Sequence, residues 1–419
     1  MNSLTILPMS FLWLCTFFLH RQEVVNVVNS GADTANVKLF GAVGDGKNDD
    51  TKAIIDAVRS NARVIFFPSG TYKISRTIPL NSNKELLGVN QKSVLLNTNV
   101  KEMLKTFGPN HYNDITIKGL RLEGNVKEGE NKLVICMQFY NIIKVNIINC
   151  SFNSSSAGVG FQSCKSIIVK GCTFNGMYQQ PLKNATYAGV YGYGIVLNEC
   201  DKAVIEGNNI GTNSPHGYIM RHAVYISNNR KRDAVSSSDI IIRDNTIFLK
   251  DYTKSQPLTG FEYVFKSIGG RNILIERNRA YGGIGGVLLT YNFVNPLNIN
   301  VENNQFNGLK QYGIFVNPET EADKKCILSD LTVKNNSFIM NEKNAQAFRI
   351  INYKKLEIKN NDFVNQHTNT DNRSVFLYLK KNNTAINSKT IEASNNKISG
   401  FKQMILNDNP KDKVNLLIR

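Results

Sequence analysis

The sequence has few of the residues that mark metal-binding or disulfide-rich proteins. Its 419 residues include seven cysteines and five histidines, with no Cys-x-x-Cys pair and no Cys/His spacing typical of zinc sites. We expect no metal and no cofactor, because a calcium site would need clustered carboxylates and no strong cluster occurs. Five cysteines fall between residues 136 and 200. We interpret them as small buried residues that could form a disulfide if the chain is exported.

Long apolar runs are also scarce, since a single one extends from Leu4 to Leu19. It is short for a transmembrane helix and suits the apolar part of a secretory signal. We therefore predict a secreted, periplasmic or cell-envelope protein. The run lacks a preceding Lys or Arg and a small-x-small cleavage site, so a membrane anchor through residues 4–19 is the alternative.

Acidic residues are the minority charge, with 33 Asp and Glu against 50 Lys and Arg, which gives a net charge of +17. A field of that sign attracts polyanions such as an acidic polysaccharide, a phosphate-rich envelope surface or nucleic acid. Export disfavours nucleic acid. Because the lysines are spread along the chain, solvated lysines at strand edges explain the charge equally well.

The chain also lacks linkers, and one short phrase, apolar-x-apolar-x-x-Asn-x-apolar, recurs from Ile115 onward. Its alternation places Ile, Val or Leu inward, and a second strand recurs between the phrases. The anchor residue fits a tight bend with left-handed backbone geometry, and stacked anchors would form an internal asparagine ladder. The pattern predicts a solenoid anchored at Leu120, Cys150, Cys172, Asn208, Asn245, Asn278, Asn304, Asn336, Asn361 and Asn396.

The segment Val37–Ser75 precedes the repeats and reads as a strand, a Gly-Asp-Gly turn, a helix and a second strand. Asp49 and Asp50 can accept the free N–H groups at the start of the helix. Its apolar residues fall on one face. The role of these carboxylates is therefore predicted to be structural.

The linked pair GAVGDGKNDDTKAI and VIFFPSGTYKIS resembles the N-terminal cap of the pectate-lyase-like superfamily, which includes polysaccharide lyases, rhamnogalacturonases, epimerase-like proteins and phage tailspikes. The resemblance implies an all-β fold, a single-stranded right-handed parallel β-helix with an N-terminal α-helical cap. The resemblance to phage tailspikes also allows a trimer, and the oligomeric state is otherwise not predicted. We divide the chain into a signal or anchor (1–30), the cap and first coils (31–110), the repeats (111–405) and a C-terminal tail (406–419).

The candidate functional residues lie in the middle third, where the longest insertions between repeats occur. Cleavage of a uronate polymer by β-elimination needs a cation for the carboxylate, a base for the adjacent ring proton and an acid for the leaving oxygen. A structural interpretation would make the same side chains strand-edge or solvated residues. We predict His222, Tyr225, Lys266 and Arg271 as catalytic and His216, Tyr218, Arg221, Glu262 and Tyr291 as substrate-binding.

Two further resemblances bear on the reaction. The stretch FEYVFKSIGGRNILIERN is loosely similar to the strand of alginate and chondroitin lyases that carries a catalytic Lys, which implies that role for Lys266. Polygalacturonases are matched only by His216-Gly217 and Arg349-Ile350, without the paired aspartates that hydrolysis needs. The sequence thus favours β-elimination of an acidic polysaccharide. A polygalacturonase-like hydrolase and a non-catalytic glycan-binding or surface solenoid, with tyrosines as sugar platforms, are the alternatives.

Overall fold

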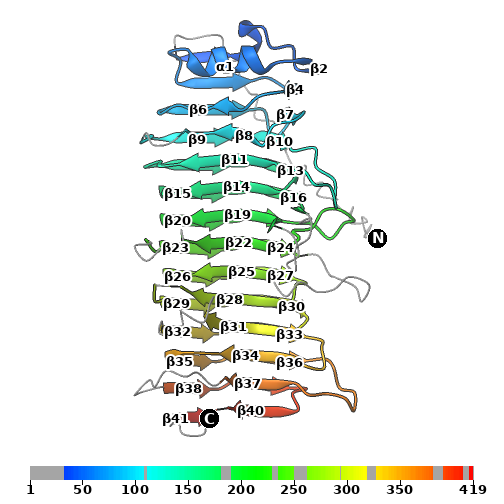
Figure 1. The fold of residues 1–419 in the computed structure, drawn as a ribbon, viewed down its shortest axis with the longest axis vertical. Helices are drawn as coiled ribbons and strands as arrows, with labels where there is room; N and C mark the ends of the chain where they lie inside the picture. The colour runs from blue at the N-terminus through cyan, green and yellow to red at the C-terminus, as the bar shows by residue number, and fades with distance from the viewer. Residues whose placement is uncertain are drawn as a thin grey trace, which may run out of the picture.

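The computed structural model describes residues 33–107, 111–180, 190–228, 235–249, 262–292, 294–318, 327–380, 390–408 and 415–418. The described chain winds through three parallel sheets in turn, and each strand pairs with its equivalent in the next coil (Figure 1). This arrangement confirms the predicted parallel β-helix. The predicted signal or anchor (1–30) lies outside the described residues, and the other predicted boundaries stay predictions.

The first sheet carries the recurring phrase identified in the sequence. Its 14 strands, in spatial order, are β1 (Thr34–Asn36), β3 (Val64–Phe67), β6 (Lys84–Gly88), β9 (Ile115–Lys118), β12 (Val145–Ile148), β15 (Lys165–Lys170), β20 (Asp201–Glu206), β23 (Ser238–Arg243), β26 (Arg271–Glu276), β29 (Leu297–Glu302), β32 (Leu328–Lys334), β35 (Tyr353–Lys359), β38 (Thr390–Ser394) and β41 (Asn415–Ile418).

The second sheet follows the anchor residue of each phrase. Its 13 strands are β2 (Asp45–Asp49), β4 (Gly70–Ile74), β7 (Ser93–Asn97), β10 (Leu120–Glu123), β13 (Ser151–Ser155), β16 (Thr173–Met177), β21 (Asn209–Ile210), β24 (Thr246–Phe248), β27 (Arg279–Tyr281), β30 (Gln305–Leu309), β33 (Ser337–Met340), β36 (Asp362–Asn365) and β39 (Lys397–Ser399).

The third sheet contains the second recurring strand of each coil. Its 12 strands are β5 (Ile78–Pro79), β8 (Glu102–Lys105), β11 (Ile135–Tyr140), β14 (Ala157–Gln162), β19 (Tyr193–Asn198), β22 (His222–Ser227), β25 (Tyr263–Ile268), β28 (Gly285–Tyr291), β31 (Tyr312–Pro318), β34 (Gln346–Ile350), β37 (Val375–Leu379) and β40 (Gln403–Asn407). A separate antiparallel pair joins β17 (Gln179–Gln180) and β18 (Val190–Tyr191).

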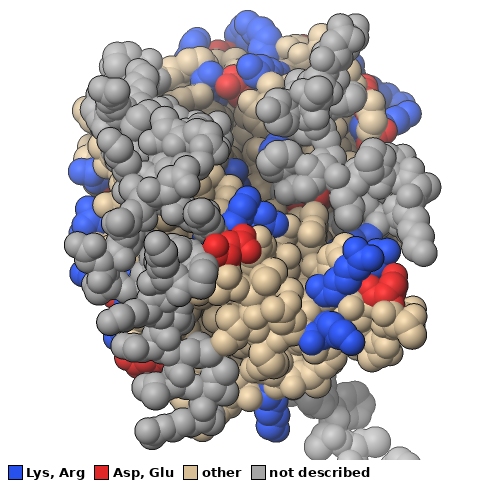
Figure 2. Space-filling model, turned by 60° about the horizontal axis from the view of Figure 1, so that its bottom comes forward, with Lys and Arg blue, Asp and Glu red and all other residues tan. Residues whose placement is uncertain are grey.

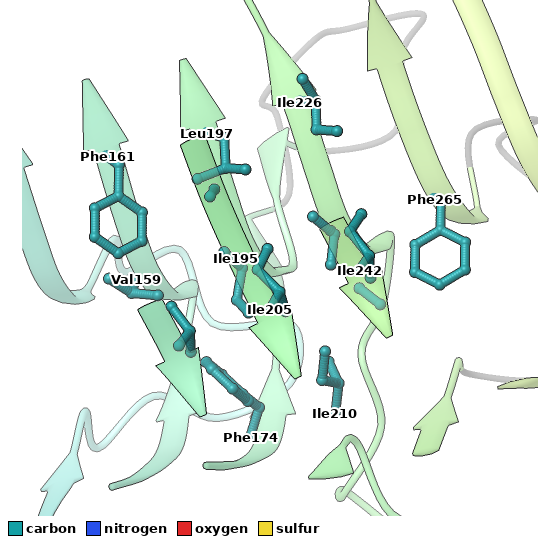
Figure 3. Close-up of a cluster of buried hydrophobic side chains, with 14 of the residues drawn as sticks. Val159, Phe161, Phe174, Ile195, Leu197, Ile205, Ile210, Ile226, Ile242 and Phe265 are labelled. Carbon is teal, nitrogen blue, oxygen red and sulfur yellow. The ribbon is translucent and has the colours of Figure 1, made fainter. Parts of the chain in front are cut away.

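Inward side chains of the three sheets fill the interior of the solenoid. Val159, Ile205 and Phe174 come from three different strands, and none is exposed to solvent. Figure 3 shows such residues from neighbouring coils pointing into one shared core. Rings repeat from coil to coil, as in the parallel stack of Phe152 on Phe174, whose centroids lie 4.7 Å apart. The core is therefore continuous along the axis.

The N-terminal segment differs in detail from its prediction. The predicted first strand is a 3-10 helix, η1 (Val37–Phe40), and the predicted turn contains β2. Helix α1 (Thr51–Arg59) lies at the N-terminal end of the solenoid (Figure 1) and buries Ile54 and Val58. Asp50 does not cap α1 with its side chain, contrary to the prediction.

The carboxylates of Asp45, Asp49 and Asp50 accept hydrogen bonds from nearby backbone. Asp49 accepts from the backbone N–H of Thr51 at 3.0 Å. Asp50 instead accepts from the N–H groups of Val43 and Gly44, at 2.6 and 3.1 Å. Hydrogen bonds from Ser75 and Thr51 lower the pKa of Asp49, although burial acts most strongly and in the opposite direction. These bonds support the predicted structural role.

The anchor residues stack as predicted at the corner between the first and second sheets, which we call the asparagine corner. The amide of Asn278 donates to Oδ1 of Asn304 at 3.0 Å and accepts from Asn245 at 2.9 Å. The same link joins each anchor asparagine to the next, from Asn208 to Asn396. Cys172 precedes the ladder and donates its backbone N–H to Asn208.

The left-handed backbone geometry falls one residue before each anchor, which corrects the prediction. Asn303 and Asn335, which precede Asn304 and Asn336, both have a φ of 56°. The anchors themselves are not in this region, because their amides must point inward along the axis. Positive φ recurs at Gly119, Asn149, Gly171, Gly207, Asp244, Arg277, Asn303, Asn335, Asn360 and Asn395.

The cysteines of the described chain are buried and free, in agreement with the predicted packing role. Cys150 and Cys172 occupy anchor positions ahead of the asparagines, and Cys164 and Cys200 occupy another corner. Burial raises the pKa of the Cys136 thiol to about 12, so this side chain stays neutral. Cys15 and Cys326 lie outside the described residues.

Candidate functional site

The outer face of the third sheet brings together several of the predicted site residues. Tyr225 on β22 lies directly opposite Lys266 on β25, and both alternate with core residues. The register continues through every coil, which defines a central row along this face. From the N-terminal end the central row is Lys105, Gln138, Gly160, Val196, Tyr225, Lys266, Leu288, Phe315, Arg349, Tyr378 and Leu406.

Four predicted residues meet at the middle of this face. The ammonium group of Lys266 lies 5.3 Å from the centroid of the Tyr225 ring. His222 is 5.5 Å from the same ring and stacks on Tyr193, with centroids 5.6 Å apart. The guanidinium of Arg221 lies 5.7 Å from the Tyr193 ring. Two cations, an imidazole and two phenols therefore form one cluster, which we call the central cluster.

His222 lies behind the surface of this cluster, with 1% of its area exposed. Burial lowers the pKa of its imidazole well below the ordinary value, and the positive charges of Arg221 and Lys266 act in the same direction. The ring is therefore neutral. Its Nδ1 lies 2.9 Å from the carbonyl oxygen of Tyr263, which can only accept, so Nδ1 carries the proton and Nε2 is the acceptor.

A groove of about 440 Å³ opens beside the central cluster on its N-terminal side. Gly160 and Val196 form part of its floor, and the tyrosine rings stand around them. A Cβ at Gly160 would lie 2.5 Å from the side-chain oxygen of Gln138, so glycine keeps this floor open. The polar lining comes from Lys101, Glu102, Gln138, Tyr140, Tyr191, Tyr193, Asn198, Tyr225 and Ser227.

Most residues of this lining were not among those predicted from the sequence. Gln138 and Tyr140 on β11 and Tyr193 on β19 belong to the second recurring strand of two coils, at positions that alternate with core residues. That alternation marks them as outward-facing. Only the register between coils, which depends on the connecting loops, shows that they line one groove.

Cations lie over aromatic rings at both ends of the third sheet as well. Lys105 lies 5.3 and 5.4 Å from the rings of Phe107 and Tyr140, and it pairs with Glu102 at 2.9 Å. Arg349 lies 5.0 Å from the Phe315 ring and 5.6 Å from that of Tyr378, its neighbours in the central row. The outer face thus holds Lys105, Arg221, Lys266 and Arg349 against flat rings.

The C-terminal half of this face is filled rather than hollow. Tyr263 and Tyr312 stack with centroids 6.1 Å apart, across Gly285, where a Cβ would lie 2.5 Å from the Tyr263 ring. Arg349 donates from Nη1 to the Tyr312 hydroxyl at 3.1 Å. Leu288 packs into the same cluster. Aromatic packing therefore occupies the space that the groove leaves open further toward the N-terminus.

Three predicted residues lie away from the central cluster. Arg271 is on β26, beyond the Gly269–Gly270 turn, and lines a separate hollow next to Asp239. His216 is 73% exposed in its side chain and 3.6 Å from Glu128. Tyr218 lines a hollow on the second sheet. The predicted grouping of these residues with His222 was wrong, because turns carry them to other faces.

Two further predicted residues are buried. Tyr291 points into the core, with no exposed area, and its hydroxyl donates to the carbonyl of Ile351 at 3.0 Å. Glu262 is fully buried, and its carbonyl accepts from the N–H of Ile284 at 2.8 Å. Neither side chain presents a surface to a ligand in this structure, so their placement in a substrate-binding site is corrected.

Carboxylates are sparse around the groove. Glu102 is the one carboxylate among the described residues that line it, and it is paired with Lys105. Within the described ranges, no three His, Cys, Asp or Glu side chains gather closely enough to hold a metal ion. Nor is any helix in those ranges long and apolar enough to cross a membrane. The central cluster can therefore offer cations and phenols more readily than facing carboxylates.

Residues 34–256 match the family model described as rhamnogalacturonase A/epimerase, pectate lyase-like. This match covers more than half of the chain. The chain belongs to this family. The superfamily expected from the N-terminal motifs is thereby confirmed, and with it a relationship to β-helix proteins that act on polysaccharides.

Two curated relatives share parts of the sequence. The plasmin and fibronectin-binding protein A of Streptococcus pneumoniae is 24% identical in an alignment of 368 residues, and the match covers 80% of this chain and 45% of that protein. The preneck appendage protein of Bacillus phage PZA is 41% identical over 61 residues, which are 15% of this chain and 7% of that protein. The chain spans less than half the length of each of these relatives.

Solved structures show the same fold at low identity. A surface adhesin of Streptococcus pneumoniae superposes with a TM-score of 0.63 and 18% identity over 92% of this chain and 93% of that one. An exopolygalacturonase from Thermotoga maritima superposes with a TM-score of 0.57 and 14% identity over 93% of both chains. The A-module of a mannuronan C-5 epimerase from Azotobacter vinelandii superposes with a TM-score of 0.56 and 14% identity, over 92% of this chain and 99% of that one. Enzymes and an adhesin thus share this architecture.

Proposed function

We propose that the outer face of the third sheet binds an acidic polysaccharide and that the central cluster cleaves it by β-elimination. The observation that carries this proposal is the series of cations held against rings along one face: Lys105, Arg221, Lys266 and Arg349. Rings can stack on sugar faces while the cations pair with uronate carboxylates. In the view of Figure 2, by contrast, basic side chains form separate small groups, several of them next to Asp or Glu.

The roles follow from position. Arg221 and Lys266 lie beside the groove and would neutralise the uronate carboxylate, which makes the adjacent ring proton easier to remove. Tyr225 lines the groove; as the phenolate it would take up the ring proton, and as the resulting phenol it would give that proton to the leaving sugar oxygen. The electrons of the broken C–H bond form a double bond, and the C–O bond to the leaving sugar breaks. That sugar oxygen takes up a proton.

His222 would act as a positioning residue. It is buried and neutral, it stacks on Tyr193, and Tyr263 fixes its tautomer. Hydrolysis is the weaker alternative, because it needs two carboxylates on opposite sides of the scissile bond. Glu102 alone supplies a carboxylate among the described lining residues.

The test incubates the full chain with pectate, alginate, hyaluronan and chondroitin sulfate. Ultraviolet absorbance of the unsaturated uronate and a reducing-sugar assay are recorded together. We expect both signals to rise with one polymer. Tyr225→Phe should lose cleavage while keeping the binding ring, and Lys266→Ala should lose both cleavage and affinity. Lys144→Ala, an exposed lysine paired with Asp114, is the control and should change neither. Reducing ends without absorbance would refute β-elimination.

A non-catalytic adhesin is the second candidate. One observation favours it: the relative that aligns with 80% of this chain is named for binding plasmin and fibronectin, and the matching solved structure is called a surface adhesin. Binding of an acidic polymer or of those proteins, with no product in either assay, would support this candidate. The same relatives support a surface location, which antibody labelling of intact cells would test.

A further inference from the structure

A second hollow lies on the outer face of the second sheet, away from the central cluster. Its volume is about 340 Å³. Phe248 on β24 is in register with Tyr281 on β27, which is in register with Asn307 on β30. Ile219 bridges to Leu249, so Tyr218, one residue earlier, lies beside Phe248. Three aromatic side chains and an amide therefore follow one another along the solenoid.

The rings form an exposed flat surface. Those of Phe248 and Tyr281 are parallel within 11°, with centroids 4.8 Å apart. Tyr281 is 38% exposed, which is high for an aromatic residue on a sheet face. Stacking between coils explains why the rings are parallel. It does not explain why polar amides surround them.

Amides and glycines complete the hollow. Asn213, Asn307 and Asn341 line it, and no charged residue is among its described lining residues. Gly282 has a φ of 79°, and a Cβ there would lie 2.7 Å from the Leu249 carbonyl. Gly308 also has a positive φ, with its nearest potential Cβ contact at 3.9 Å. The glycines therefore leave space beside the rings that a side chain would otherwise fill.

We propose that this hollow binds an uncharged sugar unit of a glycan, separately from the acidic polymer on the third sheet. A charged ligand would find no opposite charge among the lining residues, and a purely apolar ligand would leave three amides without partners. A pyranose ring satisfies both conditions. Its C–H face packs on Phe248 and Tyr281, and its hydroxyls both donate to and accept from the amides.

Tyr218 is one of the residues that line this hollow. The predicted role of this residue in substrate binding is moved here from the central cluster, because its backbone carbonyl accepts from Met177 N–H at 3.0 Å and thereby holds it on the second sheet. The proposal does not depend on cleavage at the third sheet, since the two sites share no lining residue.

The test applies the full chain to an array of neutral oligosaccharides of glucose, galactose, mannose and N-acetylglucosamine, followed by calorimetry with the best probe. Tyr281→Ala should weaken binding at least tenfold, and Tyr281→Phe should retain it. Asn307→Ala should weaken binding several-fold. Leu39→Ala, an exposed apolar residue at the N-terminal end, is the matched control and should bind as the unmodified chain does.

Two crossed measurements separate the sites. Lys266→Ala should leave neutral-sugar binding unchanged, and Tyr281→Ala should leave cleavage of the acidic polymer unchanged. High salt should weaken binding of the acidic polymer and leave binding of the neutral probe unchanged. No binding by any neutral probe, equal affinity for Tyr281→Ala, or loss of neutral binding in salt would each overturn the proposal.

Discussion

The asparagine corner and the outer face of the third sheet are both rich in polar side chains, yet they use them in opposite ways. In the asparagine corner each buried amide has its partners within the fold, as Asn278 does with Asn245, Asn304 and the carbonyl of Ile242. On the outer face the cations lie over rings, beside a groove of about 440 Å³.

The difference separates structural from functional polarity. A polar group whose hydrogen bonds are completed by neighbouring coils contributes to stability and has little left to offer a ligand. A cation held over a ring is attracted by the negative face of the ring and still carries its full positive charge. Changes in the asparagine corner should therefore alter folding, and changes on the outer face should alter binding.

The largest effect is expected from Asn278→Leu. This change leaves the backbone N–H of Asn245 without its acceptor, and it removes one hydrogen bond from the amide of Asn245 and one from Oδ1 of Asn304, all in a buried site. We expect a loss of about 3 kcal/mol or more in the free energy of unfolding. Urea unfolding followed by circular dichroism measures it. Asn300→Ala, at an outward position on β29 of the first sheet, is the control. An equal loss of stability there would show that buried and outward asparagines do not differ.

A pH-dependent effect is expected from His222. Because its pKa is lowered in the folded chain, only the unfolded chain takes up a proton as the pH falls below about 6.5. The unfolded state then binds more protons, so stability decreases by up to about 1.4 kcal/mol per pH unit below that value. The decrease continues until the folded form also titrates.

His222→Gln should remove this part of the acid sensitivity, as seen in urea midpoints measured above and below about pH 6.5. His111→Gln changes an exposed histidine and serves as the control. If both variants show the same pH dependence as the unmodified chain, the imidazole of His222 is not held neutral by burial.

A binding effect without a folding effect is expected from Arg349→Gln. The change removes a cation between Phe315 and Tyr378 while keeping the rings. Affinity for the acidic polymer should fall about tenfold, equivalent to about 1.4 kcal/mol, as for one charge-assisted contact. Calorimetry measures it against Arg59→Gln on α1. A large drop in unfolding temperature with unchanged affinity would instead make Arg349 structural.

The smallest effect is expected from Arg277→Asn in the asparagine corner. Arg277 is exposed, pairs with Asp244 at 2.9 Å and has a φ of 51°. Asparagine adopts that backbone region readily, as Asn303 does one coil further along. The small loss from the exposed ion pair should be offset by the better backbone conformation of asparagine, so both stability and affinity should stay unchanged. A marked loss of stability would show that exposed charges matter at this corner.

The fold could be predicted because the information is local and repeated. Each phrase carries its own alternation and its own anchor, so Asn304 and Asn336 identify the same corner without knowledge of the rest. The N-terminal segment was less regular, and η1 replaced a predicted strand. The backbone geometry before each anchor was missed because Gly, Asp, Arg and Asn all occur there.

The site could be predicted only in part because it depends on register. Tyr225 and Lys266 occupy equivalent places in successive strands, so their adjacency follows from the repeat. Arg271 lies five residues beyond Lys266, yet a glycine turn carries it to another sheet. Tyr291 lies three positions after the outward Leu288, and because this offset is odd its side chain points inward. Whether a side chain points inward or outward depends on its position along the strand and cannot be predicted from residue types alone.

The ladder of amides in the asparagine corner has a direction as well as a strength. From Asn208 to Asn396, each amide N–H donates to the oxygen of the next coil, so the dipoles of seven side chains add head to tail along the axis. Aligned dipoles polarise one another. A coil inserted without an asparagine would divide this array into two shorter ones, and a coil inserted with one would lengthen it. The asparagine corner therefore favours insertion of complete coils that each carry an anchor asparagine at the same position.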